Sequence, residues 1–79
     1  MKPQYELKEG FEAAVRKALR TNISHYRQQR GWTVAQLAEN AGVGFSVIAR
    51  LGQKGRNLPS LYTLLKIAQT LDVRVADLF

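Results

Sequence analysis

Basic side chains are the groups whose chemistry is most evident in this sequence. The chain has 79 residues, with 12 Lys and Arg against 6 Asp and Glu, a net charge of +6 and a sequence pI near 10.2. Residues 1–12 and residues 72–79 each have a net charge of −1, so residues 13–71 carry +8. In this middle segment there are nine Lys and Arg, and Glu39 is its single acidic residue. Such a concentration of positive charge is typical of a polyanion-binding protein. A solubilising surface, or affinity for acidic proteins or membranes, is the alternative.

Side chains suited to catalysis or metal binding are scarce. The chain has no Cys and a single histidine, His25, which excludes a disulfide scaffold and thiolate-bound metal. The serines Ser24, Ser46 and Ser60 have no base within a plausible constellation, so the sequence does not indicate a serine-type enzyme. We therefore expect no enzymatic activity, no metal and no cofactor.

Membrane and export signals are also missing from the sequence. No apolar run approaches the roughly 18 residues that a membrane span needs. The first residues, M-K-P-Q-Y-E-L-K-E-G, have no apolar stretch of the kind found in signal peptides. We expect a cytoplasmic protein with no membrane partner.

One long apolar stripe predicts the first helix, over about 11 to 30. Its residues recur every four positions: Phe11, Val15, Leu19 and Ile23. Gly31 marks the end of the helix. Thr21 and Asn22 could instead cap a second helix, but the stripe stays in phase across them, which favours one continuous helix. Residues 1–10 are predicted to be an N-terminal arm, and residues 11–79 the folded domain.

A capping box predicts a short second helix over about 34–40. In T-V-A-Q, Thr33 can cap the helix while Gln36 reaches back, and Trp32 and Leu37 occupy the positions of a hydrophobic staple. Trp32 is therefore interpreted as a core residue rather than a base-stacking platform.

Glycines and a proline separate the remaining helices. Gly42 suits a left-handed turn, after which Val47, Ile48 and Leu51 mark the buried side of a helix over about 45–52. A polar loop follows, Ser60 can cap the next helix, and a last short helix is expected near the end. The apolar positions of these two helices are Leu61, Leu64, Leu65, Ala68 and Leu71, then Val75, Leu78 and Phe79. The predicted fold is all-α, with five helices and an N-terminally extended first one.

Two short helices joined by a tight glycine turn have the shape of a helix-turn-helix, whose second helix enters the DNA major groove. If Val34 is the first residue, every inward position is apolar: Leu37, Ala38, Ala41, Val43, Ile48 and Leu51. Ala38 is small where the two helices would touch. The alternative is an ordinary helical hairpin in a structural bundle.

The outward side of the third helix has side chains that can approach base edges. The predicted base-facing residues are Gly44, Phe45, Ser46, Ala49 and Arg50. Phe45 suits a thymine methyl group, or it folds back over Val43 or contacts a protein. Arg50 suits bidentate contact with guanine, or it contacts phosphate or forms a surface pair. Lys54, Arg56 and Asn57 are predicted to clamp phosphates, the alternative being a solvated loop.

Residues from about 19 to 79 resemble the Cro and phage-repressor type helix-turn-helix family, the XRE family. The matching stretches are I-S-H-Y-R-Q-Q-R-G-W-T, A-Q-L-A-E-N-A-G-V, S-V-I-A-R-L, N-L-P-S-L-Y-T-L-L-K-I-A-Q-T-L-D-V and A-D-L-F. The resemblance implies a five-helix domain that represses or regulates transcription, usually as a dimer on a two-fold operator. Gly44, Phe45, Ser46 and Arg50 match the family's base-facing positions. The phosphate-contacting positions match Thr33, Gln36 and the loop that begins with Gln53.

The chain departs from the family pattern at three places. Gly52 stands where the family usually has Glu, and the loop after it is one residue longer. In many members that Glu pairs with the arginine matched here by Arg27, so Arg27 needs helix-end carbonyls, water or a DNA phosphate as its partner. Gly44 replaces the usual Ser or Thr cap.

The leading expectation is a sequence-specific regulator that binds double-stranded DNA, a repressor on a two-fold operator reading bases through the helix at about 45–52. A homodimer would form through Val75, Leu78 and Phe79, or through Phe11 and Val15 on the extra helical turns. The alternative is an antitoxin or adaptor that uses residues 11 to 20 to bind a partner protein such as a toxin.

Overall fold

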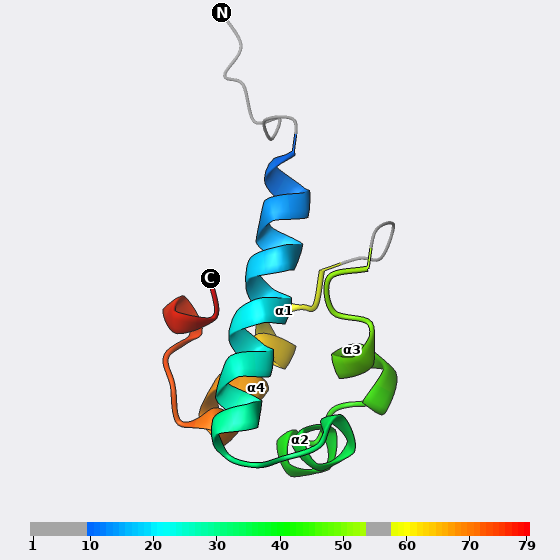
Figure 1. The fold of residues 1–79 in the computed structure, drawn as a ribbon, viewed down its shortest axis with the longest axis vertical. Helices are drawn as coiled ribbons and strands as arrows, with labels where there is room; N and C mark the ends of the chain where they lie inside the picture. The colour runs from blue at the N-terminus through cyan, green and yellow to red at the C-terminus, as the bar shows by residue number, and fades with distance from the viewer. Residues whose placement is uncertain (1–9, 54–57) are drawn as a thin grey trace, which may run out of the picture.

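The computed structural model describes residues 10–53 and 58–79, which contain helices and no strand (Figure 1). In chain order the elements are α1 (Phe11–Gln29), α2 (Val34–Ala41), α3 (Phe45–Ala49), α4 (Leu61–Leu71) and the 3-10 helix η1 (Val75–Leu78). The predicted all-α class is confirmed, with four α-helices and η1 as the fifth helical segment. The predicted arm lies outside the described residues apart from Gly10.

The first helix is continuous. α1 runs for 19 residues without a break at Thr21 and Asn22, so the stripe was in phase because a single helix carries it. The side chain of Asn22 donates a hydrogen bond from Nδ2 to the carbonyl oxygen of Leu78, 3.0 Å away, and so joins α1 to η1. The N-terminal half of α1 extends beyond the other helices (Figure 1), and its first buried residue is Leu19.

Three helices end in the same way. A residue in the left-handed conformation follows α1, α2 and α4: Gly31, Gly42 and Asp72. The next amide then donates to a carbonyl five residues back: Trp32 to Arg27, Val43 to Ala38, and Val73 to Ala68. These bonds satisfy carbonyls at the helix ends that would otherwise have no partner. The predicted turn at Gly42, with φ at 69°, is confirmed.

The core is built from one face of each element. Its largest fully buried side chains are Leu19, Ile23, Leu37, Ile67 and Leu78. Trp32 packs against this core, as predicted, and the Arg30 guanidinium lies 5.3 Å from its ring centroid. Arg30 also donates to the carbonyl oxygen of Leu71, 3.0 Å away, so the ends of α1 and α4 are held together.

The predicted apolar face of α4 is partly wrong. Leu61 is 65% exposed and Leu65 is 47% exposed, whereas the buried residues are Leu64, Ile67, Ala68 and Leu71. These four follow the i, i+3, i+4, i+7 spacing of one helix face. The sequence has apolar residues on two faces of this helix, so periodicity alone did not decide which face packs inward.

The short helix η1 is fixed at its start by an acidic side chain. The Asp77 carboxylate accepts from the backbone nitrogen of Arg74 at 2.9 Å and from its guanidinium at 3.1 Å. These hydrogen bonds lower the pKa of Asp77 below its ordinary value. Across residues 10–53 and 58–79, no helix is long and apolar enough to cross a membrane.

Candidate nucleic-acid interface

The predicted capping box is present at the start of α2. Thr33 Oγ1 accepts from the backbone nitrogen of Gln36 at 3.1 Å, and Gln36 Oε1 accepts from that of Thr33 at 2.8 Å. The acceptor oxygens of both side chains are thus engaged by backbone amides. The hydroxyl proton of Thr33 and the amide NH₂ of Gln36 remain as outward donors, a chemistry suited to an anionic oxygen.

A lysine from α4 secures the turn between α2 and α3. Lys66 Nζ donates to the carbonyl oxygen of Gly42 at 3.1 Å and lies 5.1 Å from the ring centroid of Tyr62. This role of Lys66 has no signal in the sequence, because its partner lies 24 positions away and no local pattern links the two residues. The contact fixes the carbonyl around which the chain reverses toward α3.

α3 is shorter than predicted. It contains five residues and ends at Ala49, whereas the sequence pattern predicted an end near residue 52. Arg50 already has φ −102° and ψ 9°, and Gly52 has φ 82°, so the backbone turns away before Leu51 can continue the helix. Val47 was assigned to the buried side and is instead 37% exposed.

The predicted base-facing residues are all exposed. We call these residues the α3 face: Gly44, Phe45, Ser46, Ala49 and Arg50. Phe45 is 58% exposed, so its ring is not folded into the core. Within the described residues, the Arg50 guanidinium makes no hydrogen bond or ion pair. The α3 face therefore offers a bulky apolar ring, a hydroxyl and an uncommitted guanidinium.

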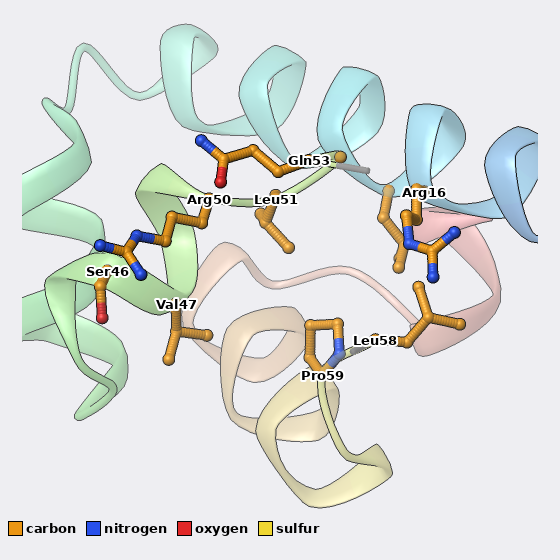
Figure 2. A pocket seen from close by; sticks show the side chains of 10 residues that line it. Arg16, Ser46, Val47, Arg50, Leu51, Gln53, Leu58 and Pro59 are labelled. Carbon is orange, nitrogen blue, oxygen red and sulfur yellow. The ribbon is translucent and has the colours of Figure 1, made fainter. Parts of the chain in front are cut away.

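A cavity of about 300 Å³ lies between α1, α3 and residues 58–59. Figure 2 shows Arg50 and Arg16 at opposite ends of it, with Leu58 on the side of Arg16. Arg16 forms an ion pair with Glu12 at 3.2 Å, so its charge is engaged within α1. Gln53, a predicted phosphate contact, is exposed at the border of this cavity.

The other predicted phosphate contacts have different positions. Lys54, Arg56 and Asn57 lie outside the described residues. Arg27 is half-buried, and its Nη1 donates to the carbonyl oxygen of Trp32 at 2.6 Å. This carbonyl belongs to the segment between α1 and α2, so it is a different partner from the helix-end carbonyls expected for Arg27, and the contact engages one nitrogen of the guanidinium.

Gly52 has a structural reason to be glycine. Its φ is 82°, and a Cβ there would lie 2.9 Å from Arg20 Cδ and 3.1 Å from Arg20 Cβ. The backbone conformation and the close approach of α1 both exclude a larger residue. The glutamate usual in the family therefore does not fit this backbone, and the stem of Arg20 occupies the neighbouring space.

Gly52→Ala is expected to destabilise the domain by about 1 to 2 kcal/mol, because alanine in the left-handed region is strained and its Cβ would press on Arg20. Urea unfolding measures the effect. Gly52→Ala combined with Arg20→Ala should recover only the steric cost that comes from Arg20 Cδ, because alanine keeps the Cβ and the backbone strain remains. Equal stability of Gly52→Ala and the wild type would contradict the close packing of this loop on α1.

The residues predicted for a dimer interface divide into three groups. Leu78 is fully buried, so its assignment to the interface is wrong: its side chain fills the core between α1 and α4. Val15 and Val75 are half-buried and pack against the core. Phe11 and Phe79 are about half exposed, which leaves them as the outward members of the set.

The fold and the α2–turn–α3 geometry define the class of this protein. A model of the helix-turn-helix family matches residues 23–78, and the chain belongs to that family. The resemblance to the Cro and phage-repressor (XRE) type is confirmed.

Several regulators are similar to this chain. The HTH-type transcriptional regulator SutR of Escherichia coli (strain K12) is 38% identical over 55 residues, covering 70% of this chain and 30% of SutR. SinR of Bacillus subtilis (strain 168) is 36% identical over 56 residues, which is 71% of this chain and 50% of SinR. An uncharacterized HTH-type transcriptional regulator of Archaeoglobus fulgidus is 39% identical over 61 residues, 77% of this chain and 86% of that protein.

The extent of these matches differs. This chain spans half of SinR and less than a third of SutR, but most of the archaeal protein. No solved structure gives a significant match.

Proposed function

We propose that this protein is a sequence-specific DNA-binding transcriptional regulator, a repressor that acts in the cytoplasm as a homodimer on a two-fold operator. The observation that carries the proposal is the exposed α3 face next to a turn held by Lys66. The regulators similar to this chain support it through their names. The proposed action is occupancy of DNA, without catalysis, metal or cofactor.

In the proposed complex the α3 face lies in the major groove. Ser46 and Arg50 offer hydrogen bonds to base edges, and Phe45 offers apolar contact to a thymine methyl group. Thr33, Gln36 and Gln53 direct donors to phosphates on either side, and Arg27, Lys54, Arg56 and Asn57 add charge and further donors. Phosphate contacts set the orientation, and base contacts set the sequence.

Selection of bound sites from random duplexes at physiological salt tests the proposal most directly. We expect enrichment of a short motif repeated with two-fold symmetry. The Arg50→Ala variant, selected in parallel, is the comparison. Failure to enrich any motif, although the protein is folded, would contradict sequence-specific binding.

Binding to a selected duplex should weaken steeply with salt. If Arg27, Lys54 and Arg56 each neutralise one phosphate, the slope of log affinity against log salt is about −2.7 per chain, at about −0.9 per phosphate. Fluorescence titrations between 50 and 200 mM salt, concentrations at which such slopes are typically measured, give this slope. Arg56→Ala should reduce its magnitude by about one. A slope near zero would contradict binding through the basic segment.

Arg50→Ala should change specificity as well as affinity. Loss of a bidentate base contact relaxes the preference at one base pair by about 1 to 3 kcal/mol. Competition with single-substitution duplexes measures it, and Arg56→Ala is the matched control, expected to weaken all sequences alike. If Arg50→Ala also weakens all sequences alike, Arg50 contacts phosphate rather than a base.

A second candidate function is favoured by the first turn of α1, residues 11–14, in which every residue is exposed, Phe11 included. An antitoxin or adaptor would use this segment to bind a partner protein, such as a toxin encoded nearby. A repressor that acts alone and dimerises through another surface would not use the N-terminal part of α1. Replacing Phe11 by Ser should then abolish binding to the partner and leave DNA affinity unchanged.

A further inference from the structure

A second, smaller cavity lies between α1, the start of α2 and α3, and two of its lining residues are arginines. Its volume is about 180 Å³. Ile23, Ile48 and Leu51 form apolar walls, and three polar residues of α1 line it: Arg20, Ser24 and Arg27. These three are spaced i, i+4, i+7, so they share the face of α1 that is turned toward α3.

Within the described residues, no carboxylate neutralises this pair of arginines. The ion pairs formed there are Arg16 with Glu12 and Arg74 with Asp77. Arg20 is exposed and makes no hydrogen bond or ion pair in the described part of the chain, and Arg27 engages one nitrogen on the Trp32 carbonyl. Two guanidinium groups at one cavity repel each other unless an anion lies between them.

Gly52 is linked to this arrangement. The glutamate that the family usually has there would have supplied the missing negative charge, and Gly52 instead makes room for the stem of Arg20. Two arginines with no carboxylate beside them favour an external anion at this cavity.

We propose that Arg20, Ser24 and Arg27 form a binding site for a phosphate group. Guanidinium groups donate two hydrogen bonds in a plane, which matches the oxygens of phosphate, and the Ser24 hydroxyl adds a third donor. The cavity is several times the roughly 30 Å³ share of one water, so a phosphate fits. Ala49 lines the same cavity and belongs to the α3 face, so the site lies beside the surface proposed to contact DNA.

The phosphate comes from one of two sources, the DNA backbone or a free phosphate-bearing molecule. In the first case the proposal extends the proposed function by adding Arg20 and Ser24 to the phosphate contacts. In the second case it adds a ligand site next to the recognition helix, independent of DNA. Both sources share the same chemistry, and two experiments distinguish them.

The first experiment titrates inorganic phosphate into the DNA-free protein, with chloride keeping the ionic strength constant. The Nε–Hε NMR signals of Arg20 and Arg27 should shift in a saturable manner. Arg20→Gln should weaken binding about tenfold, the loss of one charge-assisted contact, and Ser24→Ala should weaken it less. Lys17→Gln is the matched control, because Lys17 is an exposed cation on α1 that does not line the cavity. Equal effects of Arg20→Gln and Lys17→Gln would overturn the site in favour of diffuse attraction.

The second experiment uses a selected duplex in which single phosphates are replaced by neutral methylphosphonates. If the DNA backbone fills the site, the neutral replacement at one position in each half-site should lower the affinity of the wild type about tenfold. The same replacement should lower the affinity of Arg20→Gln less than about twofold. If no position is coupled to Arg20 while inorganic phosphate binding depends on it, the source is a free phosphate.

The remaining outcomes separate this proposal from the proposed function. Arg20-dependent phosphate binding by a protein that binds no duplex would support the site and contradict the DNA-binding function. Duplex binding with neither coupling nor Arg20-dependent phosphate binding would support the function and overturn the site.

Discussion

Ala38→Leu is expected to lower the melting temperature by roughly 4 to 24 °C and with it to abolish DNA binding at the upper end of that range. Ala38 is 3% exposed, and its carbonyl accepts the Val43 amide that closes the turn. Three added carbons would separate α2 from α3 at an overpacking cost of about 1 to 3 kcal/mol. Thermal melting followed by circular dichroism measures the effect.

Ala35→Leu is the matched control for this prediction. Ala35 lies on the same helix, but it is exposed, so the same substitution should change stability by no more than about 0.5 kcal/mol. A melting temperature for Ala38→Leu equal to that of Ala35→Leu would show that α2 and α3 do not meet at Ala38.

The spacing of half-sites should control tight binding. A single five-residue α3 covers few base pairs, so a second copy is needed to select one site in a genome. In a two-fold dimer the recognition helices are about 34 to 36 Å apart, one turn of the duplex. Inserting about five base pairs between half-sites places the second one on the opposite side of the DNA. We expect affinity to fall to that of a single half-site.

Sedimentation of protein with palindromic duplexes measures stoichiometry and affinity together. The properly spaced duplex should bind two chains, and a duplex with one half-site serves as the control. Replacing the exposed Phe79 or Phe11 by Ser should identify the dimer interface. The substitution that lies in the interface should reduce the affinity for the palindromic duplex and leave the affinity for the single half-site unchanged. One chain per duplex, whatever the spacing, would contradict the dimer.

Local signals in the sequence predicted the parts of the fold that short-range chemistry decides. The capping box of Thr33 and Gln36 and the left-handed turn at Gly42 are each determined within a few residues, and both are confirmed. The continuity of α1 followed from the phase of its stripe. The inward position of Ala38 was predicted from the same register and is confirmed.

Features that depend on distant parts of the chain were not predicted. The end of α3 depends on Gly52 lying against Arg20, which is 32 positions earlier in the sequence. The inward face of α4 was ambiguous because two of its faces are apolar, and the contact of Lys66 with Gly42 has no local signature. Leu78 was predicted to lie in the dimer interface, because a short terminal helix shows no periodicity that reveals its burial. The base-facing and phosphate-contacting roles stay predictions.

The bond between Asn22 and Leu78 has a consequence for the folding of the chain during synthesis. The two partners are 56 positions apart, and Leu78 fills the core beside Leu19 and Ile23. On a ribosome that adds about 5 to 20 residues per second, Leu78 is synthesised roughly 3 to 11 s after Asn22. Throughout that interval the apolar stripe of the longest helix has no complete partner, so nascent chains of this protein should be clients of chaperones that bind exposed apolar segments.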